Sequence, residues 1–396
     1  MNDALIPARI IATIALGFAV SGCASTATRP PAYGVRVSVV FDADRPDKVA
    51  ARGYSDPASR RIATADDPVR IASVSKLVTA LGVMRLVEAG KLDLDRDVSD
   101  WLGWSLRNPG FPDVPITLRM LLSHQSSLTD AADYIIPLGE TLEGWVNNPR
   151  VWDAGHRPGS YFRYTNLNFP VVASVMEKAS GERFDQLMAR LVFTPLSLDA
   201  CLNWTTCSDA AVSRAVVLTD GHGNVRRDDL KGVRPACPVV PAADGSCDLA
   251  TYPPGANGAL FSPHGGVRIS MRDLARIGKM ILHGGEGFLS PASIATLIGP
   301  EWRYDGKNGE TEKGFNCTFG LAVQTLATNR AGCQDDPFGD GFRRIGHGGE
   351  AYGLRSGLWI DRANGTGIAF FVTAIPDDAP TGKSAFTAAE EAILRR

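Results

Sequence analysis

The pattern of hydrophobic and polar positions predicts strands at both ends of the chain and helices between them. Residues 35–41 alternate and are rich in β-branched side chains, which indicates a strand, and 48–54 is expected to pair with it. Towards the C-terminus, strand patterns recur at 319–325, 353–361 and 367–375. Strands at both ends around a helical middle predict one α+β domain whose sheet is completed late.

Helical spacing of apolar residues predicts a long helix at 73–88, which Gly90 would end by adopting a left-handed conformation. The other predicted helices are 117–123, 168–179, 183–191, 270–283, 291–298 and 384–394. Loops containing Pro, Gly and Trp alternate with helices in the middle of the chain. Within a domain over 34–396, we therefore expect 34–97 and 257–396 to form an α/β part and 98–256 a mainly helical insertion.

The N-terminal stretch has the pattern of a targeting signal. Residues 10–20 are apolar and uncharged, and a run of about 11 residues is too short to span a bilayer but typical of a signal peptide. The run is followed by Ser21-Gly22-Cys23, which resembles the lipobox of bacterial lipoproteins. We expect 1–22 to be the signal peptide, Cys23 to carry a lipid anchor to the membrane, and 23–33 to be a tether.

That resemblance implies an exported protein, held in the outer membrane and facing the periplasm if the host is Gram-negative, because Ala rather than Asp follows Cys23. An ordinary secretory signal cleaved at small residues is the alternative. The product would then be a soluble periplasmic or secreted protein.

The chain has seven cysteines, and those other than Cys23 form three close pairs in loop-like sequence. Export would place them in an oxidising compartment, where disulfides form. Proximity predicts the bonds Cys201–Cys207, Cys237–Cys247 and Cys317–Cys333, and the sequence leaves other connectivities open. A metal site is the competing interpretation, but Cys-x-x-Cys spacing is missing and nearby histidines are few, so we expect no metal.

Composition narrows the class of partner. The chain has 396 residues, of which 44% are hydrophobic and 21% charged, as in ordinary globular proteins. Its 41 basic and 43 acidic residues are scattered and give a net charge of −2. A basic excess that would favour nucleic acid is lacking, so we expect a small-molecule partner and no nucleic acid.

A Ser-x-x-Lys pattern marks the start of the helix predicted at 73–88. Ser73 and Lys76 lie three positions apart, on one helix face, so the hydroxyl and the amine can meet. A serine hydroxyl needs a base to become a nucleophile, and burial or a helix dipole can lower the pKa of a lysine far enough to make it that base. The pattern is weak alone and gains weight from following an extended apolar segment.

Tyr164-Thr165-Asn166 is the one Tyr-x-Asn in the chain. A tyrosine beside a lysine can share proton transfer, because a neighbouring cation favours the phenolate and the phenol can pass a proton to a leaving group. An asparagine offers both a donor and an acceptor to a substrate amide. The alternative is a loop tyrosine packed on the core beside a turn asparagine.

His-Gly-Gly occurs three times, beginning at His264, His283 and His347. The second occurrence follows a helix and looks like its C-terminal cap, and the first leads into a capped helix. Only His347-Gly348-Gly349 lies in the strand-rich tail, where a sheet edge would face the nucleophile. Glycines there allow a substrate to approach the backbone, and the N–H groups of Glu350 and Ser73 could form an oxyanion hole.

In this order, Ser73-x-x-Lys76, Tyr164-x-Asn166 and His347-x-Gly349 resemble the class C β-lactamase-related serine hydrolases. That superfamily includes class C β-lactamases, D-Ala-D-Ala carboxypeptidases, D-aminopeptidases and family VIII esterases. The segment 121–128, Leu-Leu-Ser-His-Gln-Ser-Ser-Leu, is also similar to a family segment. The resemblance covers about residue 32 to the C-terminus and implies the β-lactamase/transpeptidase-like α+β fold, with an antiparallel sheet flanked by helices.

The resemblance implies a role for each matching residue. Ser73 would be acylated, and Lys76 with Tyr164 would transfer the protons. Asn166 would contact a substrate amide, and His347–Gly349 would bind the substrate backbone. The resemblance implies no cofactor.

Two residues depart from the family pattern. His347 stands where true β-lactamases and most carboxypeptidases have a lysine that holds the substrate carboxylate, and a histidine is mostly neutral near pH 7. Selection for carboxylate-bearing β-lactams should therefore weaken. Ser127 replaces an expected glycine, so its loop is expected to differ in shape. Arg355 is a candidate for the missing charge, but we interpret it as a surface residue of a strand.

These observations favour an exported serine hydrolase that forms an acyl-enzyme with an ester or amide substrate of peptide or cell-wall type. A β-lactamase or D-Ala-D-Ala carboxypeptidase is the alternative within the family. A non-catalytic cell-wall-binding lipoprotein is the alternative of another class, and the intact Ser73, Lys76, Tyr164 and Asn166 count against it. A zinc hydrolase is disfavoured because the chain has no His-Glu-x-x-His, and an α/β-hydrolase because it has no Gly-x-Ser-x-Gly.

Overall fold

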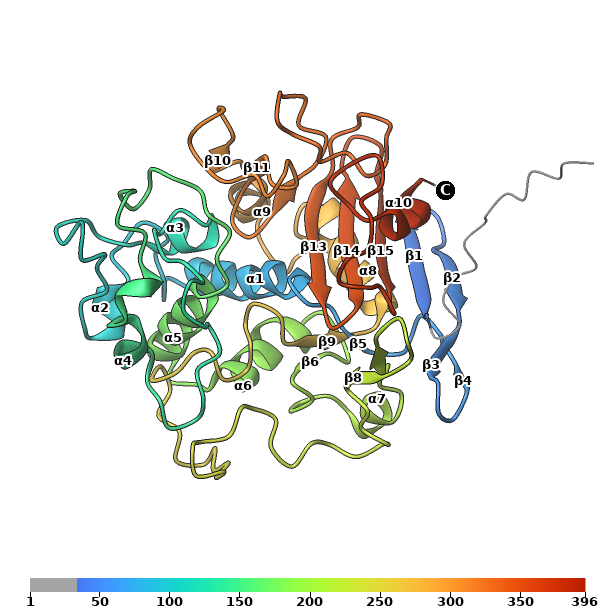
Figure 1. Ribbon diagram of the computed structural model, residues 1–396, viewed down its shortest axis with the longest axis horizontal. Helices are drawn as coiled ribbons and strands as arrows, with labels where there is room; N and C mark the ends of the chain where they lie inside the picture. The colour runs from blue at the N-terminus through green and yellow to red at the C-terminus, as the bar shows by residue number, and fades with distance from the viewer. Residues whose placement is uncertain (1–33, 396) are drawn as a thin grey trace, which may run out of the picture. The chain divides into compact units, whose positions relative to one another are not determined.

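The computed structural model describes residues 34–395, and its centre is an antiparallel sheet. The sheet has the order β10-β11-β12-β13-β14-β15-β1-β2, so the N-terminal strands pair with the last strand of the chain (Figure 1). Its strands are β1 (Arg36–Asp42), β2 (Lys48–Arg52), β10 (Trp302–Arg303), β11 (Thr318–Phe319), β12 (Gln324–Thr325), β13 (Ile345–Ala351), β14 (Leu354–Asp361) and β15 (Thr366–Val372). This late completion of the sheet confirms the predicted α+β class.

Strand β1 forms for the reason that the alternation predicted. Val37, Val39 and Phe41 are fully buried on one face, while the residues between them are partly or well exposed. Phe41 packs against Gly278 of helix α8 (Met271–Leu282), where a Cβ atom would come within 2.4 Å of the ring. The helix can therefore lie close to the sheet.

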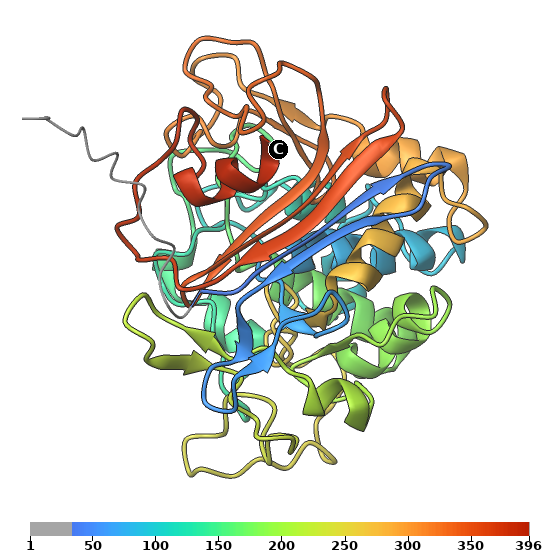
Figure 2. The same ribbon diagram turned by 90° about the vertical axis from the view of Figure 1, so that its right-hand side faces the viewer.

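Helices cover both faces of the sheet (Figure 2). Helix α8 packs against β1, β14 and β15, and α1 (Val74–Glu88) contacts β13 and β14. On α1 lies α9 (Pro291–Ile298), while α10 (Ala388–Leu394) covers β15 from the opposite side. Because α1 is packed between the sheet and other helices, nearly all its residues are buried, which fixes its first turn firmly.

The middle of the chain contributes mostly short helices. These are α2 (Ser99–Leu102), α3 (Leu118–Leu122), α4 (Leu142–Val146), the 3-10 turn η1 (Pro149–Val151), α5 (Asn168–Ser180), α6 (Phe184–Met188), the π turn η2 (Ala189–Phe193) and α7 (Asp209–Ser213). Helix α5 contacts α1, α2, α3 and α4. The helix packing brings α5 and the loop before it against the start of α1.

Small sheets complete the described part of the chain. Strands β5 (Val69–Arg70) and β6 (Cys201–Leu202) both pair with β9 (Val267–Ile269). Two hairpins are formed by β3 (Tyr54–Asp56) with β4 (Arg61–Ile62), and by β7 (Leu218–Thr219) with β8 (Val225–Arg227). Since β5 leads directly into α1, the sheet around β9 anchors the segment before that helix.

One predicted strand is wrong in form. The stretch 319–325 is not continuous: β11 and β12 pair with each other through a tight turn closed by the bond from the Gly320 N–H to the Val323 carbonyl, at 2.7 Å. Ala322 in that turn has φ +55, and its N–H donates to the carbonyl of Leu122. This contact with a distant segment stabilises a turn within 319–325, a stretch whose hydrophobic pattern is typical of one continuous strand.

The last helix begins four residues later than predicted, at Ala388. Thr387 caps it, because its side chain accepts from the Glu390 N–H while the Glu390 carboxylate accepts from the Thr387 N–H. The residues before Thr387 therefore stay outside the helix.

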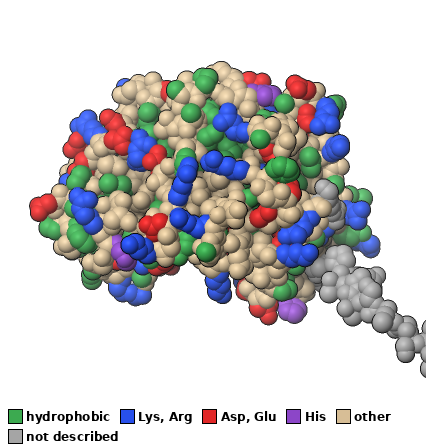
Figure 3. All heavy atoms as spheres, turned by 90° about the horizontal axis from the view of Figure 1, so that it is seen from above, with side chains coloured by type: hydrophobic (Ala, Val, Ile, Leu, Met, Phe, Trp, Pro, Cys, Tyr) green, Lys and Arg blue, Asp and Glu red, His purple; other side chains and the backbone are tan. Residues whose placement is uncertain are grey.

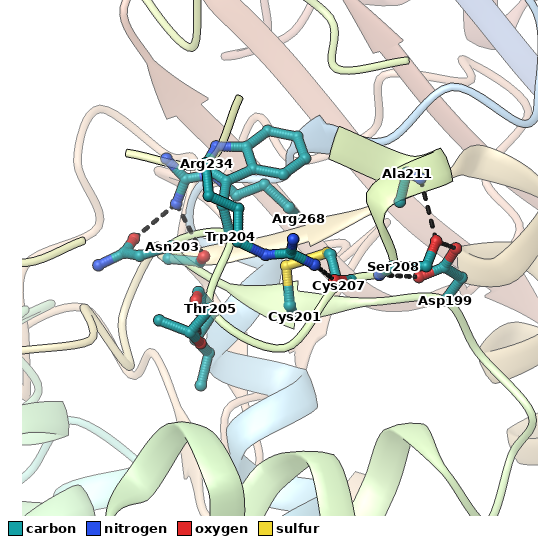
Figure 4. The surroundings of a disulfide bond; sticks show 12 residues. Asp199, Cys201, Asn203, Trp204, Thr205, Cys207, Ser208, Ala211, Arg234 and Arg268 are labelled. Atoms are coloured by element: carbon teal, nitrogen blue, oxygen red, sulfur yellow. Dashed lines mark hydrogen bonds between the residues drawn. A yellow bond between two sulfur atoms is a disulfide. The ribbon is translucent and has the colours of Figure 1, made fainter. Parts of the chain in front are cut away.

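The three predicted disulfides, Cys201–Cys207, Cys237–Cys247 and Cys317–Cys333, are all present. Figure 4 shows the first of them beside Trp204. The predicted signal peptide, lipidation site Cys23 and tether lie outside the described residues. Within the described residues, none of the helices is both long and apolar enough to traverse a bilayer.

Replacing both Cys317 and Cys333 by Ser is expected to lower the free energy of unfolding by about 3 kcal/mol, because the bond closes a loop with a separation of 16 residues. The matched pair Cys201→Ser with Cys207→Ser opens a separation of 6 residues and should cost about 2 kcal/mol. Urea unfolding curves of the three proteins measure both values. A larger loss for the shorter loop would contradict the loop-entropy explanation.

Candidate active site

Ser73 lies at the entry of α1, held by a strained turn. Ala72 before it has φ +46, in the left-handed region that side chains avoid, at a cost of about 1–3 kcal/mol. Ile71 fixes the turn on both sides: its N–H donates to the Val267 carbonyl at 3.1 Å, and its carbonyl accepts from Ser356 Oγ at 2.8 Å. The chain therefore reverses sharply and presents Ser73 at the helix start.

Lys76 is fully buried, and all its polar contacts are short. Its Nζ lies 3.0 Å from Ser73 Oγ, 2.8 Å from Asn166 Oδ1 and 3.2 Å from the carbonyl oxygen of His264. Nζ also lies 4.8 Å from the centre of the Tyr164 ring. The predicted meeting of the hydroxyl and the amine on one helix face is thus present.

Burial changes the acidity of Lys76. Desolvation lowers its pKa from 10.5 to about 7, against the opposing charges of Asp130 and Glu312, which raise it. A lysine with this pKa is substantially neutral near pH 7 and can accept a proton from Ser73.

Asn166 is oriented by an acidic residue that the motif search did not single out. Asp130 accepts from the Asn166 N–H at 2.8 Å, from Asn166 Nδ2 at 2.9 Å and from the Leu167 N–H at 3.0 Å. With its amide nitrogen held this way, Asn166 turns its oxygen to Lys76. The predicted contact of Asn166 with a substrate amide stays a prediction.

Tyr164 stands on the cleft side of Lys76. Burial raises its pKa, while a hydrogen bond with Ser73 opposes the rise, so the neutral phenol is the resting form. The expected preference for phenolate beside a lysine is therefore outweighed by desolvation. His124 of the 121–128 segment stacks on the Tyr164 ring with centroids 4.4 Å apart, and its Nδ1 accepts from the Thr165 N–H at 3.0 Å.

Strand β13 runs past the nucleophile with one side open. A Cβ atom on Gly349 would lie 3.2 Å from the Ser73 nitrogen and 2.5 Å from the Ile71 carbonyl oxygen, so the two backbones touch here. Strand β12 pairs only with Ile345 and Gly346, which leaves β13 unpaired on that side from His347 onward. The predicted sheet edge beside Ser73 is present, and the oxyanion hole of Ser73 with Glu350 stays a prediction.

The three His-Gly-Gly segments have different places. His283 ends α8, and Gly284 after it has φ +71, as a helix cap requires. His264 does precede the capped helix α8, but its carbonyl also accepts from Lys76, which the sequence did not reveal. His347 is buried in β13, and burial followed by the charge of Lys76 lowers its pKa to about 3.

A neutral His347 cannot attract a carboxylate by charge, in agreement with the weaker carboxylate selection expected from the missing lysine. Its Nδ1 lies 2.5 Å from the Gly348 carbonyl oxygen, and its ring packs edge-on against Phe319. The ring therefore packs among aromatic side chains at the wall of the cleft.

Arg355 is not the surface residue that we expected. It lines the cleft with a side chain only 16% exposed and pairs with the carboxylate of Glu350 across the β13–β14 ladder. Strand β14 lies between β13 and β15, and its residues other than Arg355 are buried. The charge of Arg355 is thereby already compensated.

Ser127, which stands in place of the expected glycine, keeps a backbone conformation that suits glycine. It has φ +65, the left-handed conformation that a glycine would adopt without strain. Its Oγ accepts from Asn108 Nδ2 at 3.0 Å, which helps to hold this conformation.

The predicted residues line one cleft of about 1110 Å³. Ser73, Tyr164, Asn166 and 347–350 reach its surface, with Lys76 directly beneath. Two loop regions contribute to the walls: one includes Tyr134 and Ile135, and the other is the disulfide-closed loop around Val239.

Within residues 34–395, His, Cys, Asp and Glu side chains form no group that could hold a metal ion. Charges of both signs are interspersed over the face in Figure 3, as the scattered sequence positions predict.

Comparisons with known proteins agree with this geometry. Residues 25–392 match the family model described as Beta-lactamase. Penicillin-binding protein 4* of Bacillus subtilis is 29% identical over 154 residues, which are 37% of this chain and 33% of that protein. The D-alanyl-D-alanine-carboxypeptidase/endopeptidase AmpH of Escherichia coli is 30% identical, over 34% and 36% of the two chains. Esterase EstB of Burkholderia gladioli is also 30% identical, over 38% and 42%.

The chain thus spans between a third and about two fifths of these curated relatives. Among solved structures, the D-amino acid amidase of Ochrobactrum anthropi SV3 has a TM-score of 0.64 at 19% identity, with 92% of both chains covered. At that identity, the likeness shows the β-lactamase/transpeptidase-like fold.

Gly349→Ala is expected to reduce hydrolytic kcat/KM at least about 100-fold, since a displacement of about 1 Å at reacting groups has such an effect. The new Cβ would lie 2.5 Å from both the Ile71 carbonyl and Ser356 Oγ. Gly348→Ala is the matched variant, because its Cβ would find its nearest atom at 3.5 Å, an ordinary contact. Steady-state kinetics of both variants test this, and equal losses would contradict the close approach at position 349.

Activity should depend on pH through Lys76. Since the neutral amine is the base, kcat/KM is expected to rise about tenfold per pH unit at low pH and to level off above pH 7, not near 10.5. Asp130→Asn removes a charge that raises the pKa of Lys76. In this variant the rise of kcat/KM with pH should therefore occur at lower pH. The measurement is a pH–rate profile of each protein, and a rise at an unchanged pH in Asp130→Asn would count against Lys76 as the titrating group.

Proposed function

The chain belongs to the beta-lactamase family, and we propose that it is an exported serine hydrolase acting through an acyl-enzyme on an ester or amide. The observation that carries this proposal is the pair Ser73–Lys76: a hydroxyl at 3.0 Å from a buried amine whose pKa is lowered to about 7. A nucleophile and a base matched in this way are what acyl transfer requires. Burying a lysine is energetically unfavourable, and a non-catalytic binding protein would gain nothing from a buried amine beside a serine hydroxyl.

The proposed reaction begins with the neutral amine of Lys76 taking the proton of Ser73 Oγ. The oxygen attacks the substrate carbonyl carbon, and the negative charge that develops on the carbonyl oxygen is met by backbone N–H groups at Ser73 and β13. The bond to the leaving group breaks as the Tyr164 phenol gives that group a proton, which the Lys76 ammonium restores. Water then attacks the acyl-Ser73 ester and releases the acid and the free hydroxyl.

Within this chemistry, we favour an esterase, amidase or peptidase over a dedicated β-lactamase. The buried, neutral His347 supports this preference, because it stands where a lysine would hold the carboxylate of a β-lactam. The relatives that are named as an esterase and as a carboxypeptidase/endopeptidase point to the same range of substrates.

Export is supported by the N-terminal sequence and by the disulfides. An apolar run followed by Ser21-Gly22-Cys23 is the pattern of a lipoprotein signal. Three disulfides fit a protein that works in an oxidising compartment. We infer a lipid anchor on Cys23, which mass spectrometry of the membrane-extracted protein would detect.

The test of function is a panel of an aryl ester, a D-amino-acid amide, a D-Ala-D-Ala peptide and a chromogenic cephalosporin, given to wild type and Ser73→Ala. Wild type should turn over the ester or the amide fastest, and Ser73→Ala should lose activity by about 10⁴-fold or more, as removal of a nucleophile does. Mass spectrometry should find the acyl group on Ser73. Full activity of Ser73→Ala would refute the mechanism.

A further inference from the structure

A second cation is buried in the cleft, and within residues 34–395 it forms no salt bridge, although the charge of Asp228 acts on it. Arg70 ends β5, three residues before Ser73, and is only 8% exposed. Its Nε is buried without a hydrogen-bond partner in the described structure, and the side chain lines the same cleft as Ser73. A buried guanidinium N–H without an acceptor is unfavourable, so its retention calls for a ligand.

Tyr352 and Arg227 stand beside Arg70 in the same corner of the cleft. The Tyr352 ring has the Arg70 guanidinium 5.2 Å from its centre and the Arg227 guanidinium at 5.0 Å. Arg227 Nη2 also donates to the Tyr352 hydroxyl at 3.3 Å. All three residues line the cleft. The corner therefore offers two guanidinium groups and a phenol hydroxyl.

The acidic residues of this corner are already occupied by other cations. Asp228 accepts from Arg268 Nη2 at 2.9 Å and from Trp204 Nε1 at 2.9 Å. Arg268 Nη1 also donates a hydrogen bond to Asn203 Oδ1 at 2.7 Å (Figure 4). Asp229 lies 3.8 Å from Lys231 Nζ. Asp228 is thus engaged mainly by Arg268 and offsets the charge of Arg70 only in part, while Arg227 forms no salt bridge among the described residues.

Arg70 is nevertheless charged near pH 7. Burial, followed by repulsion from Arg268, lowers its pKa to about 9, and Asp228 opposes this shift. An anion placed on the guanidinium would remove the unfavourable terms. A planar guanidinium matches a carboxylate through two parallel hydrogen bonds, which makes this the best-fitting anion.

We propose that Arg70, Arg227 and Tyr352 form a subsite that binds a carboxylate group of the substrate. This proposal rests on the proposed hydrolase function and narrows its substrate class to esters or amides that bear a carboxylate at a distance from the reacting carbonyl.

The distance follows from β13. Gly349 touches the backbone of Ser73, and Ala351, the last residue of β13, lies roughly 7 Å further along at about 3.3 Å per residue. Tyr352 is the next residue and begins the turn to β14. His347 lies on the other side of Gly349. The anion is therefore bound at the end of the cleft away from His347.

The kinetic test compares esters that differ in one charge. For the acyl half, p-nitrophenyl hemisuberate is compared with p-nitrophenyl octanoate. For the leaving half, the acetate ester of 7-hydroxyheptanoate is compared with heptyl acetate. Wild type is expected to prefer the carboxylate ester of one pair by about 10-fold to 100-fold in kcat/KM, the range of a hydrogen bond to a charged group. The pair that shows the preference identifies the half that carries the carboxylate.

Arg70→Gln and Arg227→Gln should each remove most of that preference. Arg226→Gln is the matched control, because Arg226 neighbours Arg227 on β8 but pairs with Asp220, at 3.8 Å, and does not line the cleft. This control should keep the full preference. Arg227 is exposed, so its variant carries the test even if Arg70→Gln fails to fold.

A binding measurement separates this proposal from the proposed function. Calorimetry should detect suberate binding to Ser73→Ala and its loss in Ser73→Ala combined with Arg227→Gln. Suberate binding without any ester hydrolysis by wild type would reject the hydrolase and keep the subsite. Hydrolysis without preference in either ester pair, or a preference that survives both Arg70→Gln and Arg227→Gln, would overturn the subsite.

Discussion

The active site depends on one buried amine. Lys76 is held in a dry environment by the packing of α1 against the sheet and α5, and this desolvation moves its pKa to about 7. An ammonium buried here is unfavourable unless its protons have acceptors, and Ser73, Asn166 and the His264 carbonyl supply three. Ser73 Oγ, the Asn166 side-chain amide and the Tyr164 ring therefore surround the Lys76 nitrogen. Folding and catalysis therefore use the same interactions.

The second constraint is that a strand must stay open beside a helix start. Strand β12 is only two residues long, so β13 keeps free backbone groups along its length past Ser73. Because residue 349 is a glycine, the backbone of β13 can contact the backbone of Ile71 and Ser73. Ser356 Oγ of β14 donates a hydrogen bond to the Ile71 carbonyl and so stabilises the turn before Ser73. A substrate can then complete the sheet edge while its carbonyl lies over the nucleophile.

The sequence was sufficient for the elements and motifs that depend on local pattern. The helix at Ser73 and the strands with alternating burial follow from local spacing, and proximity along the chain favoured the three disulfides that form. The features that the sequence did not predict depend on contacts between distant segments. The hydrogen bond from the Ala322 N–H to the Leu122 carbonyl accompanies the turn that divides 319–325 into two strands. Lys76 donates to the backbone carbonyl of His264, and a backbone contact of this kind does not depend on the type of side chain. Likewise, the resting state of Tyr164 is set by burial, which a motif does not reveal.

Charge along the cleft explains why shared catalytic residues need not mean shared substrates. At one end of β13, His347 is neutral and Arg355 is compensated by Glu350, so neither is available to an anion. At the other end, Arg70 and Arg227 flank Tyr352, and neither forms a salt bridge within the described residues. With the proposed subsite, the attraction for a carboxylate lies at that end of the cleft, while Ser73 and Lys76 lie at its centre. Because Coulomb attraction is strongest where solvent is excluded, the buried Arg70 sets this preference more than exposed charges do. In this proposal, residues at the side of the cleft, such as Arg70 and Arg227, determine which substrate binds. Ser73 and Lys76 at its base determine the reactivity.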